Sequence, residues 1–229
     1  MNIIHRSRRE FISLAAIGAV AGTGLLSACG SHEDEGQKVS PPEDLMQEHG
    51  LLNRILLIYD HCGNLLQQNQ AFPIEALQQS ATIIRTFVED YHEKQEENYL
   101  FPRFIKAQQH TALVNTLLTQ HKAGRAITEQ LMQLTRSQRL SDNERQELLR
   151  LLSAFNNMYR PHEAREDTVL FPAFRKLVSS HEYDALGEEF EKNEERKFGK
   201  DGFEHILAKV ADIEKSLHIF ELDQFTPVI

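Results

Sequence analysis

The sequence carries the stretch HEKQEENYLFPRF at residues 92–104 and a second version of it, HEAREDTVLFPAF, at residues 162–174. Both copies follow one pattern: His-Glu, two variable residues, Glu, an acidic residue, two variable residues, and Leu-Phe-Pro-x-Phe. A match of this length indicates an internal repeat. In each copy a His lies four residues before a Glu, so that both side chains share one face of a helix. The spacing therefore predicts two helices that each present an imidazole and a carboxylate to one metal site.

The repeat extends upstream to a lone histidine. Glu48-His49 precedes the first copy, and Gln120-His121 precedes the second copy by a similar number of residues. One unit is thus a helix with a lone His followed by a helix with His-x-x-x-Glu, and two units make four helices. Short connections between them favour antiparallel neighbours. The sequence predicts an all-α, up-down four-helix bundle.

The repeated residues form a complete ligand set for two metal ions. We expect Glu96 and Glu166 to bridge two ions such as iron or manganese about 3.5–4 Å apart. The remaining ligands would be one imidazole pair for each ion: His49 with His92, and His121 with His162. The alternative is a polar seam left by duplication, but buried imidazoles and carboxylates without partners are costly.

We interpret the polar residues near these six as solvated, hydrogen-bonded or packing side chains. Glu93 and Glu163 lie about a quarter-turn from the ligand face, so we expect them to be solvated, with a role as spare ligands kept open. Tyr159 is interpreted as a packing residue and Arg125 as a solvated side chain. The other histidines are read as solvated or hydrogen-bonded: His5, His32, His61, His110, His181, His205 and His218.

The domain boundaries follow from helix signals. We predict a bundle over residues 43–178, with its first helix beginning at Pro42 and its third spanning 111–135. Ser141 and Glu144 have the spacing of a capping box that opens the fourth helix, and Pro161 should loosen that helix. Residues 179–229 are predicted to form a helical extension at 181–198 and 203–217. Its expected buried face comprises Leu186, Phe190, Ile206, Val210 and Ile213.

The N-terminus has the pattern of an export signal. Arg8-Arg9 precedes an apolar run in residues 12–26, which is typical of a twin-arginine signal peptide over residues 1–28. Leu26-Ser27-Ala28-Cys29 resembles a lipobox, which implies cleavage before Cys29 and lipidation of its sulfur. A non-cleaved anchor and cleavage without lipidation are the alternatives. Residues 29–42 are then a flexible tether, and the chain is expected in the cell envelope, on the periplasmic or extracellular side.

Charge and cysteine content narrow the possible partners. The net charge of -9 in 229 residues disfavours nucleic-acid binding, which needs a basic face. Contact with a membrane is expected only through the lipid on Cys29. Cys62 is then the remaining cysteine, which excludes an intramolecular disulfide and suits a small buried side chain.

The six-residue pattern resembles the haemerythrin-like (HHE cation-binding) family over about residues 43–175. The resemblance implies a non-haem di-iron centre held by His49, His92, Glu96, His121, His162 and Glu166. The ferritin pattern Glu-x-x-His fits less well, because Glu89 precedes His92 but Tyr159 takes the matching place before His162.

The sequence departs from the oxygen-carrying haemerythrins in two places. These carriers have a second His one turn away on the third helix, where this chain has Leu117 and Arg125. Their last motif places an Asp five residues after the His, whereas Glu166 lies four after His162. The cysteine-bearing N-terminal segment of the iron–sulfur repair branch is also absent from the sequence.

Two functions follow from these patterns. The first is a di-iron protein that binds, senses or reduces O₂, NO or peroxide. The second is a metal-storing or structural bundle, with zinc or another metal, that acts through a protein partner at its extension. The fewer imidazoles near His121 favour reaction with O₂ over reversible carriage.

Overall fold

The computed structural model describes residues 39–137 and 139–228. The predicted export and lipidation residues Arg8, Arg9 and Cys29, with most of the predicted tether, lie outside these ranges. Within them every regular element is a helix, which confirms the all-α class. No helix in the described ranges has the length and apolar character needed to span a membrane.

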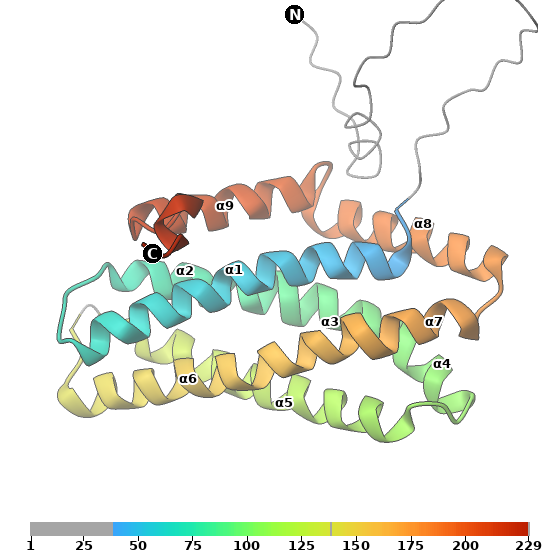
Figure 1. Cartoon of the computed structure of the whole chain (residues 1–229), viewed down its shortest axis with the longest axis horizontal. Helices are drawn as coiled ribbons and strands as arrows, with labels where there is room; N and C mark the ends of the chain where they lie inside the picture. Colours follow the sequence, from blue (N-terminus) through green and yellow to red (C-terminus); the bar gives the residue numbers. More distant parts are fainter. Residues whose placement is uncertain (1–38, 138, 229) are drawn as a thin grey trace, which may run out of the picture.

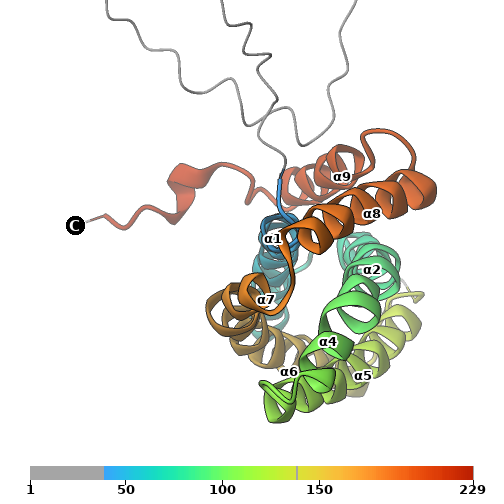
Figure 2. The ribbon, with the colours of Figure 1, turned by 90° about the vertical axis from the view of Figure 1, so that its right-hand side faces the viewer.

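The elements from α1 to α7 form four antiparallel helical rods, which pack side by side as a bundle (Figures 1 and 2). Rods one and three are the single helices α1 (Pro41–Gln67) and α5 (Thr111–Leu134). Rod two comprises α2 (Ile74–Ile83), η2 (Ile84–His92), α3 (Glu93–Gln95), η3 (Glu96–Leu100) and α4 (Phe101–Lys106). Rod four comprises α6 (Asp142–Arg165), η4 (Glu166–Leu170) and α7 (Phe171–Leu177). Helix α1 packs against α2 and α6, and α5 packs against the same two helices.

Two capping boxes set the starts of α1 and α6. The predicted box of Ser141 and Glu144 is present, which stabilises the first turn because both orphan N–H groups gain an acceptor. An equivalent box joins Ser40 and Glu43. Helix α1 therefore begins at Pro41, one residue earlier than predicted, and the tether region gives way to helix before residue 42.

Both copies of the repeat widen into π-helix directly at the ligand Glu. The N–H of Phe101 bonds to the carbonyl of Glu96, and that of Phe171 to Glu166. The next residue in each copy is a proline, which has no N–H and whose ring crowds the carbonyl four residues earlier. A wider turn accommodates this ring. The sequence analysis predicted a loosened turn at Pro161. This prediction is wrong, because α6 continues as α-helix through Pro161.

A polar layer separates two apolar clusters along the bundle. On α1, Leu45 belongs to one cluster and Leu52 to the other, and His49 lies between them. On α5, Leu117 and Leu131 flank His121 in the same way. The buried ionisable residues are thus enclosed on both sides by packed side chains that exclude water. Cys62 is fully buried, as predicted for a lone cysteine on a helix.

The extension covers the α1–α2 side of the bundle (Figure 2). It consists of α8 (Ser180–Phe198), α9 (Gly202–Ser216) and a 3₁₀ turn, η5 (Leu222–Phe225). Arg54 on α1 holds α9 through Glu214, with Nη2 and Oε2 2.5 Å apart. The predicted buried face of Leu186, Phe190, Ile206, Val210 and Ile213 is confirmed.

Candidate metal centre

The bundle brings all six sequence-predicted ligand residues into one buried layer. Their donor atoms form two groups in which all donors lie within 4.8 Å of one another: one of His49, His92 and Glu96, and one of His121, His162 and Glu166. Each side chain is 4 % exposed or less. The two groups match the predicted pairing of imidazoles, one pair for each ion.

Each carboxylate reaches imidazoles of both groups. Glu166 Oε2 lies 3.1 Å from His162 Nε2 and 3.5 Å from His49 Nε2. Glu96 Oε2 lies 3.4 Å from His121 Nε2 and 3.9 Å from His92 Nε2. Both carboxylates therefore lie between the two imidazole pairs, which is the placement of bridging ligands.

Each of the four imidazoles also has a partner at its other nitrogen, Nδ1, which fixes the ring with Nε2 facing inward. These outer contacts are His49 with Asp167 (2.7 Å), His92 with Glu48 (2.8 Å), His121 with Glu97 (3.1 Å) and His162 with Gln120 (2.9 Å). The sequence analysis missed these acceptors. The signal was available, because each one is the sequence neighbour of a predicted ligand in both repeat copies.

The lone histidine of each unit is held by the other unit. Phe171 stacks on His49 and Phe101 stacks on His121, with ring centroids 5.5 and 5.6 Å apart. Asp167 and Glu97 reach the same two imidazoles. The Leu-Phe-Pro-x-Phe segment, which the sequence identified only as core, thus also orients the imidazole across the bundle.

In the metal-free layer the pKa values of the two carboxyl groups are shifted in opposite directions. Burial and the nearby charge of Glu166 raise the pKa of Glu96 well above its usual value. Burial opposes ionisation of Glu166 too, but contacts with His162 and His49 hold its pKa well below the usual value. Burial lowers the pKa of His121 to about 4. For His49 the opposing contacts with Asp167 and Glu166 outweigh burial and raise the pKa to about 10.

The donor set fits a bound cation. Among the described residues, both carboxylate oxygens of Glu96 and of Glu166, and Nε2 of His121, are buried without a contact of hydrogen-bond geometry. Buried polar atoms of this kind normally have a partner. A pair of cations coordinated by these atoms would supply it.

Glu93 and Glu163 are buried, which corrects the prediction that they are solvated; their exposed fractions are 1 % and 3 %. Glu93 accepts a hydrogen bond of 2.7 Å from the Tyr159 hydroxyl, and Glu163 accepts one of 2.5 Å from Asn53. Burial raises the pKa of both carboxyls to about 8. Glu93 Oε2 lies 3.9 Å from the outer nitrogen, Nδ1, of His121.

Arg125 also differs from its predicted role as a solvated side chain. Its Nη2 lies 2.5 Å from Glu93 Oε2 and 2.7 Å from Glu97 Oε1, and 23 % of the side chain is exposed. Glu97 and Glu93 therefore share a cation on the outer, Nδ1 side of His121. Tyr159 packs as predicted, against Phe155 with ring centroids 4.3 Å apart, and in addition orients Glu93.

Comparison with known proteins identifies the domain. The family model for the hemerythrin HHE cation-binding domain matches residues 40–174, which spans all four rods of the bundle as far as α7. The chain belongs to the hemerythrin HHE cation-binding domain family. It is therefore a metal-binding helical protein, and the resemblance found in the sequence is confirmed.

Relatives of this HHE-domain chain occur in mycobacteria. An uncharacterised protein of Mycobacterium tuberculosis (strain ATCC 25618 / H37Rv) and one of Mycobacterium bovis (strain ATCC BAA-935 / AF2122/97) are each 43% identical to it over 233 residues. The alignment covers 96% of this chain and 91% of each relative, so it includes the extension beyond the HHE domain. No solved structure matches the chain.

Proposed function

We propose that this HHE-domain protein is a non-haem di-iron protein of the cell envelope that binds, senses or reduces O₂, NO or peroxide. The observation that carries the proposal is the pair of buried carboxylates, each within 4 Å of imidazoles from both groups. Mixed imidazole and carboxylate ligands suit iron or manganese. When bound, such a metal pair supplies open coordination positions and redox chemistry for a small molecule.

The chain's own residues prepare the site before any ligand arrives. Nδ1 partners such as Asp167 and Glu48 keep the imidazoles in one orientation. The apolar clusters on both sides exclude water from the layer. A dry, oriented ligand set restricts access to molecules small enough to pass between packed side chains.

The asymmetry near His121 supports reaction over reversible carriage. Leu117, one turn before His121, lies in an apolar cluster, and Arg125, one turn after it, is paired with Glu93 and Glu97. Neither position contributes a third imidazole. A metal ion held by His121 and His162 would keep more open positions, and open positions admit small molecules.

The cell-envelope location is a proposal from sequence alone. It is supported by Arg8-Arg9 before an apolar run and by Leu26-Ser27-Ala28-Cys29. The twin-arginine route carries folded proteins, which would let the buried metal layer be filled before export. Redirecting the chain through an unfolded-chain pathway should then lower its metal content, and equal content by both routes would contradict this rationale.

Metal analysis and optical titration test the proposed function. Protein matured in its native host should contain two irons per chain and show charge-transfer bands that change on anaerobic reduction. Repeated addition and removal of O₂ should end in a stable oxidised state. Release of unchanged O₂ over several cycles would instead support reversible oxygen carriage. A metal analysis that finds zinc or no metal would favour the storage or structural alternative.

A further inference from the structure

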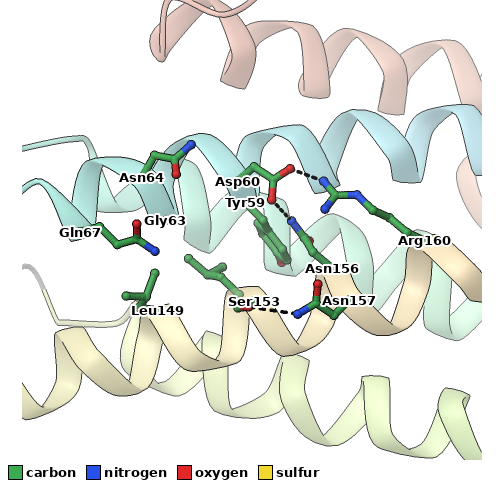
Figure 3. A pocket seen from close by; sticks show the side chains of 11 residues that line it. Tyr59, Asp60, Gly63, Asn64, Gln67, Leu149, Ser153, Asn156, Asn157 and Arg160 are labelled. Carbon is green, nitrogen blue, oxygen red and sulfur yellow. Dashed lines mark hydrogen bonds and ion pairs between the residues drawn. The ribbon is translucent and has the colours of Figure 1, made fainter.

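Two hollows on the bundle differ in volume and in the charge of the residues that line them. The first lies between α1 and α6 (Figure 3) and has a volume of about 110 Å³. Its charged residues are paired, since Arg160 bonds to Asp60. The buried Tyr59 hydroxyl and the Asn156 side-chain oxygen, Oδ1, lack partners among the described residues. The hollow has room for about three water molecules at ~30 Å³ each, which can supply those hydrogen bonds. This hollow therefore needs no further ligand.

The second hollow, here the α8 groove, lies between rod two and the extension. It has a volume of about 410 Å³ and is lined by Tyr91, Lys94, Gln95, Tyr99, Arg196 and Lys197, together with polar neighbours. This volume is within the range of roughly 300–1,000 Å³ seen for small-molecule sites. We propose that the α8 groove binds a small organic anion, a carboxylate carried on an apolar body.

A buried amide donor marks the floor of the groove. Gln95 is 3 % exposed, and its Oε1 accepts a 3.2 Å hydrogen bond from Asn193 on α8. Its Nε2 is buried without a contact of strict hydrogen-bond geometry among the described residues, and its side chain interacts with the Tyr91 hydroxyl. Because a buried N–H group without an acceptor is unfavourable, this nitrogen is suited to a ligand oxygen.

The charge of the groove selects an anion. Lys94, Arg196 and Lys197 line it against a single lining carboxylate, Asp90, and Lys94 is also paired with Glu97 outside the lining. Arg196 already bonds to Asn193 (2.8 Å) and keeps further N–H donors for a carboxylate. Lys197 reaches the backbone carbonyl of Asp90, which holds its ammonium over the groove.

Two aromatic rings favour an apolar body on the anion. Tyr91 and Tyr99 line the same groove, and Tyr91 packs edge-on against Phe198 of α8 with ring centroids 5.3 Å apart. The carboxylates around the Tyr91 hydroxyl, Glu48, Asp44 and Glu194, disfavour an anionic head at that end. The anionic group is therefore placed near Arg196 and Lys197, and the apolar part against the rings.

The groove depends on both parts of the chain. Its floor comes from rod two, whereas Asn193, Arg196 and Lys197 come from α8. The match to the HHE domain ends at residue 174, so α8 adds a site that the domain alone lacks.

Lys94 also links this groove to the metal layer, because its Nζ lies 2.5 Å from Glu97 Oε2 and Glu97 Oε1 lies 3.1 Å from His121 Nδ1. An anion that attracts Lys94 would loosen the outer partner of His121.

Binding of benzoate to the full chain tests the proposal. Benzoate should bind with one-to-one stoichiometry in calorimetry, and its neutral analogue benzyl alcohol at least about tenfold more weakly, since the charge-assisted contacts are lost. The double variant Arg196→Ala/Lys197→Ala should lose about tenfold or more in affinity for benzoate. Both side chains are on the surface, so the variant should keep the wild-type circular dichroism spectrum.

The matched control is Lys192→Ala, which removes a cation from α8 outside the groove; that side chain is 62% exposed. It should leave benzoate affinity unchanged. Unsaturable binding, equal affinity in the double variant, or tighter binding of inorganic phosphate than of benzoate would each overturn the proposal. The measurement is made on both metal-free and metal-loaded protein, so its result is independent of the metal's identity.

Discussion

Asp167 Oδ1 lies 2.7 Å from His49 Nδ1, although 118 residues separate the two in the chain. Glu97 makes the matching contact to His121 at 3.1 Å. In both cases the acidic residue directly follows a carboxylate of the metal layer. One turn of helix therefore positions both a metal-layer carboxylate and the outer partner of an imidazole. The π-helical turns η3 and η4 begin at these two residue pairs, Glu96 with Glu97 and Glu166 with Asp167.

Removal of this outer contact should weaken metal binding without removing a ligand. We expect Asp167→Ala to lower metal affinity about 10- to 100-fold, because His49 loses the partner that orients its ring. Competition with a chelator of known affinity measures the change. The control is Asp184→Ala, an exposed aspartate on α8. Unchanged affinity in Asp167→Ala would show that the contact does not support the ligand.

Loss of a bridging carboxylate should affect both ions together. Glu96→Ala and Glu166→Ala are each expected to reduce metal content to well below one ion per chain, because each carboxylate lies between both imidazole pairs. Metal analysis after anaerobic reconstitution measures this. Glu147→Ala, on the exposed face of α6, is the control. Two tightly held ions in either bridge variant would contradict the bridging assignment.

The metal-free protein should become less stable as pH rises from 7 to 8. Burial raises the pKa of Glu93 and of Glu163 to about 8 from 4.5, so in this window the folded state binds protons that the unfolded state has released. The raised pKa of His49 acts in the same direction. The free energy of unfolding therefore falls with pH.

Urea unfolding of chelator-treated protein at several pH values measures this slope. Glu93→Gln and Glu163→Gln should each flatten it, since the amide cannot ionise. His92 and His121, whose pKa values are lowered, act in the opposite direction, but mainly below pH 7. A free energy of unfolding that rises between pH 7 and 8 would be inconsistent with buried, protonated carboxyls.

The close approach of α5 and α6 at Gly124 should be sensitive to a single methyl group. A Cβ at Gly124 would lie 2.1 Å from the Tyr159 hydroxyl oxygen, which would displace Tyr159 from Glu93. We expect Gly124→Ala to cost about 1–3 kcal/mol of stability through overpacking. Gly50→Ala is the matched control, because a Cβ there meets nothing within 4 Å and should gain about 0.5–1 kcal/mol. Thermal unfolding distinguishes the two outcomes.

The repeat alone predicted the bundle and the composition of its central layer. Helical spacing places His92 and Glu96 on one face, and duplication places His162 and Glu166 opposite them. The same reasoning failed for Glu93, because a helical wheel gives a side chain's angle on its own helix but not what the neighbouring helix presents there. Here α5 and α6 present Arg125 and Tyr159, and the quarter-turn position is buried between rods.

The positions of the wider turns and the α8 groove could not be predicted from the sequence. The prolines were visible in the sequence, yet the fourth helix tolerates Pro161 and widens before Pro172 instead. The predicted buried face of the extension followed from its apolar spacing. Its polar contribution to the α8 groove did not, because Asn193 and Arg196 have no periodic pattern that distinguishes them from a solvated face.

The lone histidine of each helical hairpin is held by residues of the other hairpin, so the contacts between the two halves are reciprocal. Each helical hairpin supplies its neighbour with an aromatic ring and an acidic residue, and receives the same pair in return. Two identical hairpins related by a twofold axis would satisfy every one of these contacts. The bundle thus has the form of a pseudo-twofold dimer of hairpins, with its two halves connected by the short loop after α4. The two halves differ at the second glutamate of each motif, because Arg125 faces Glu93 in one half and Asn53 faces Glu163 in the other.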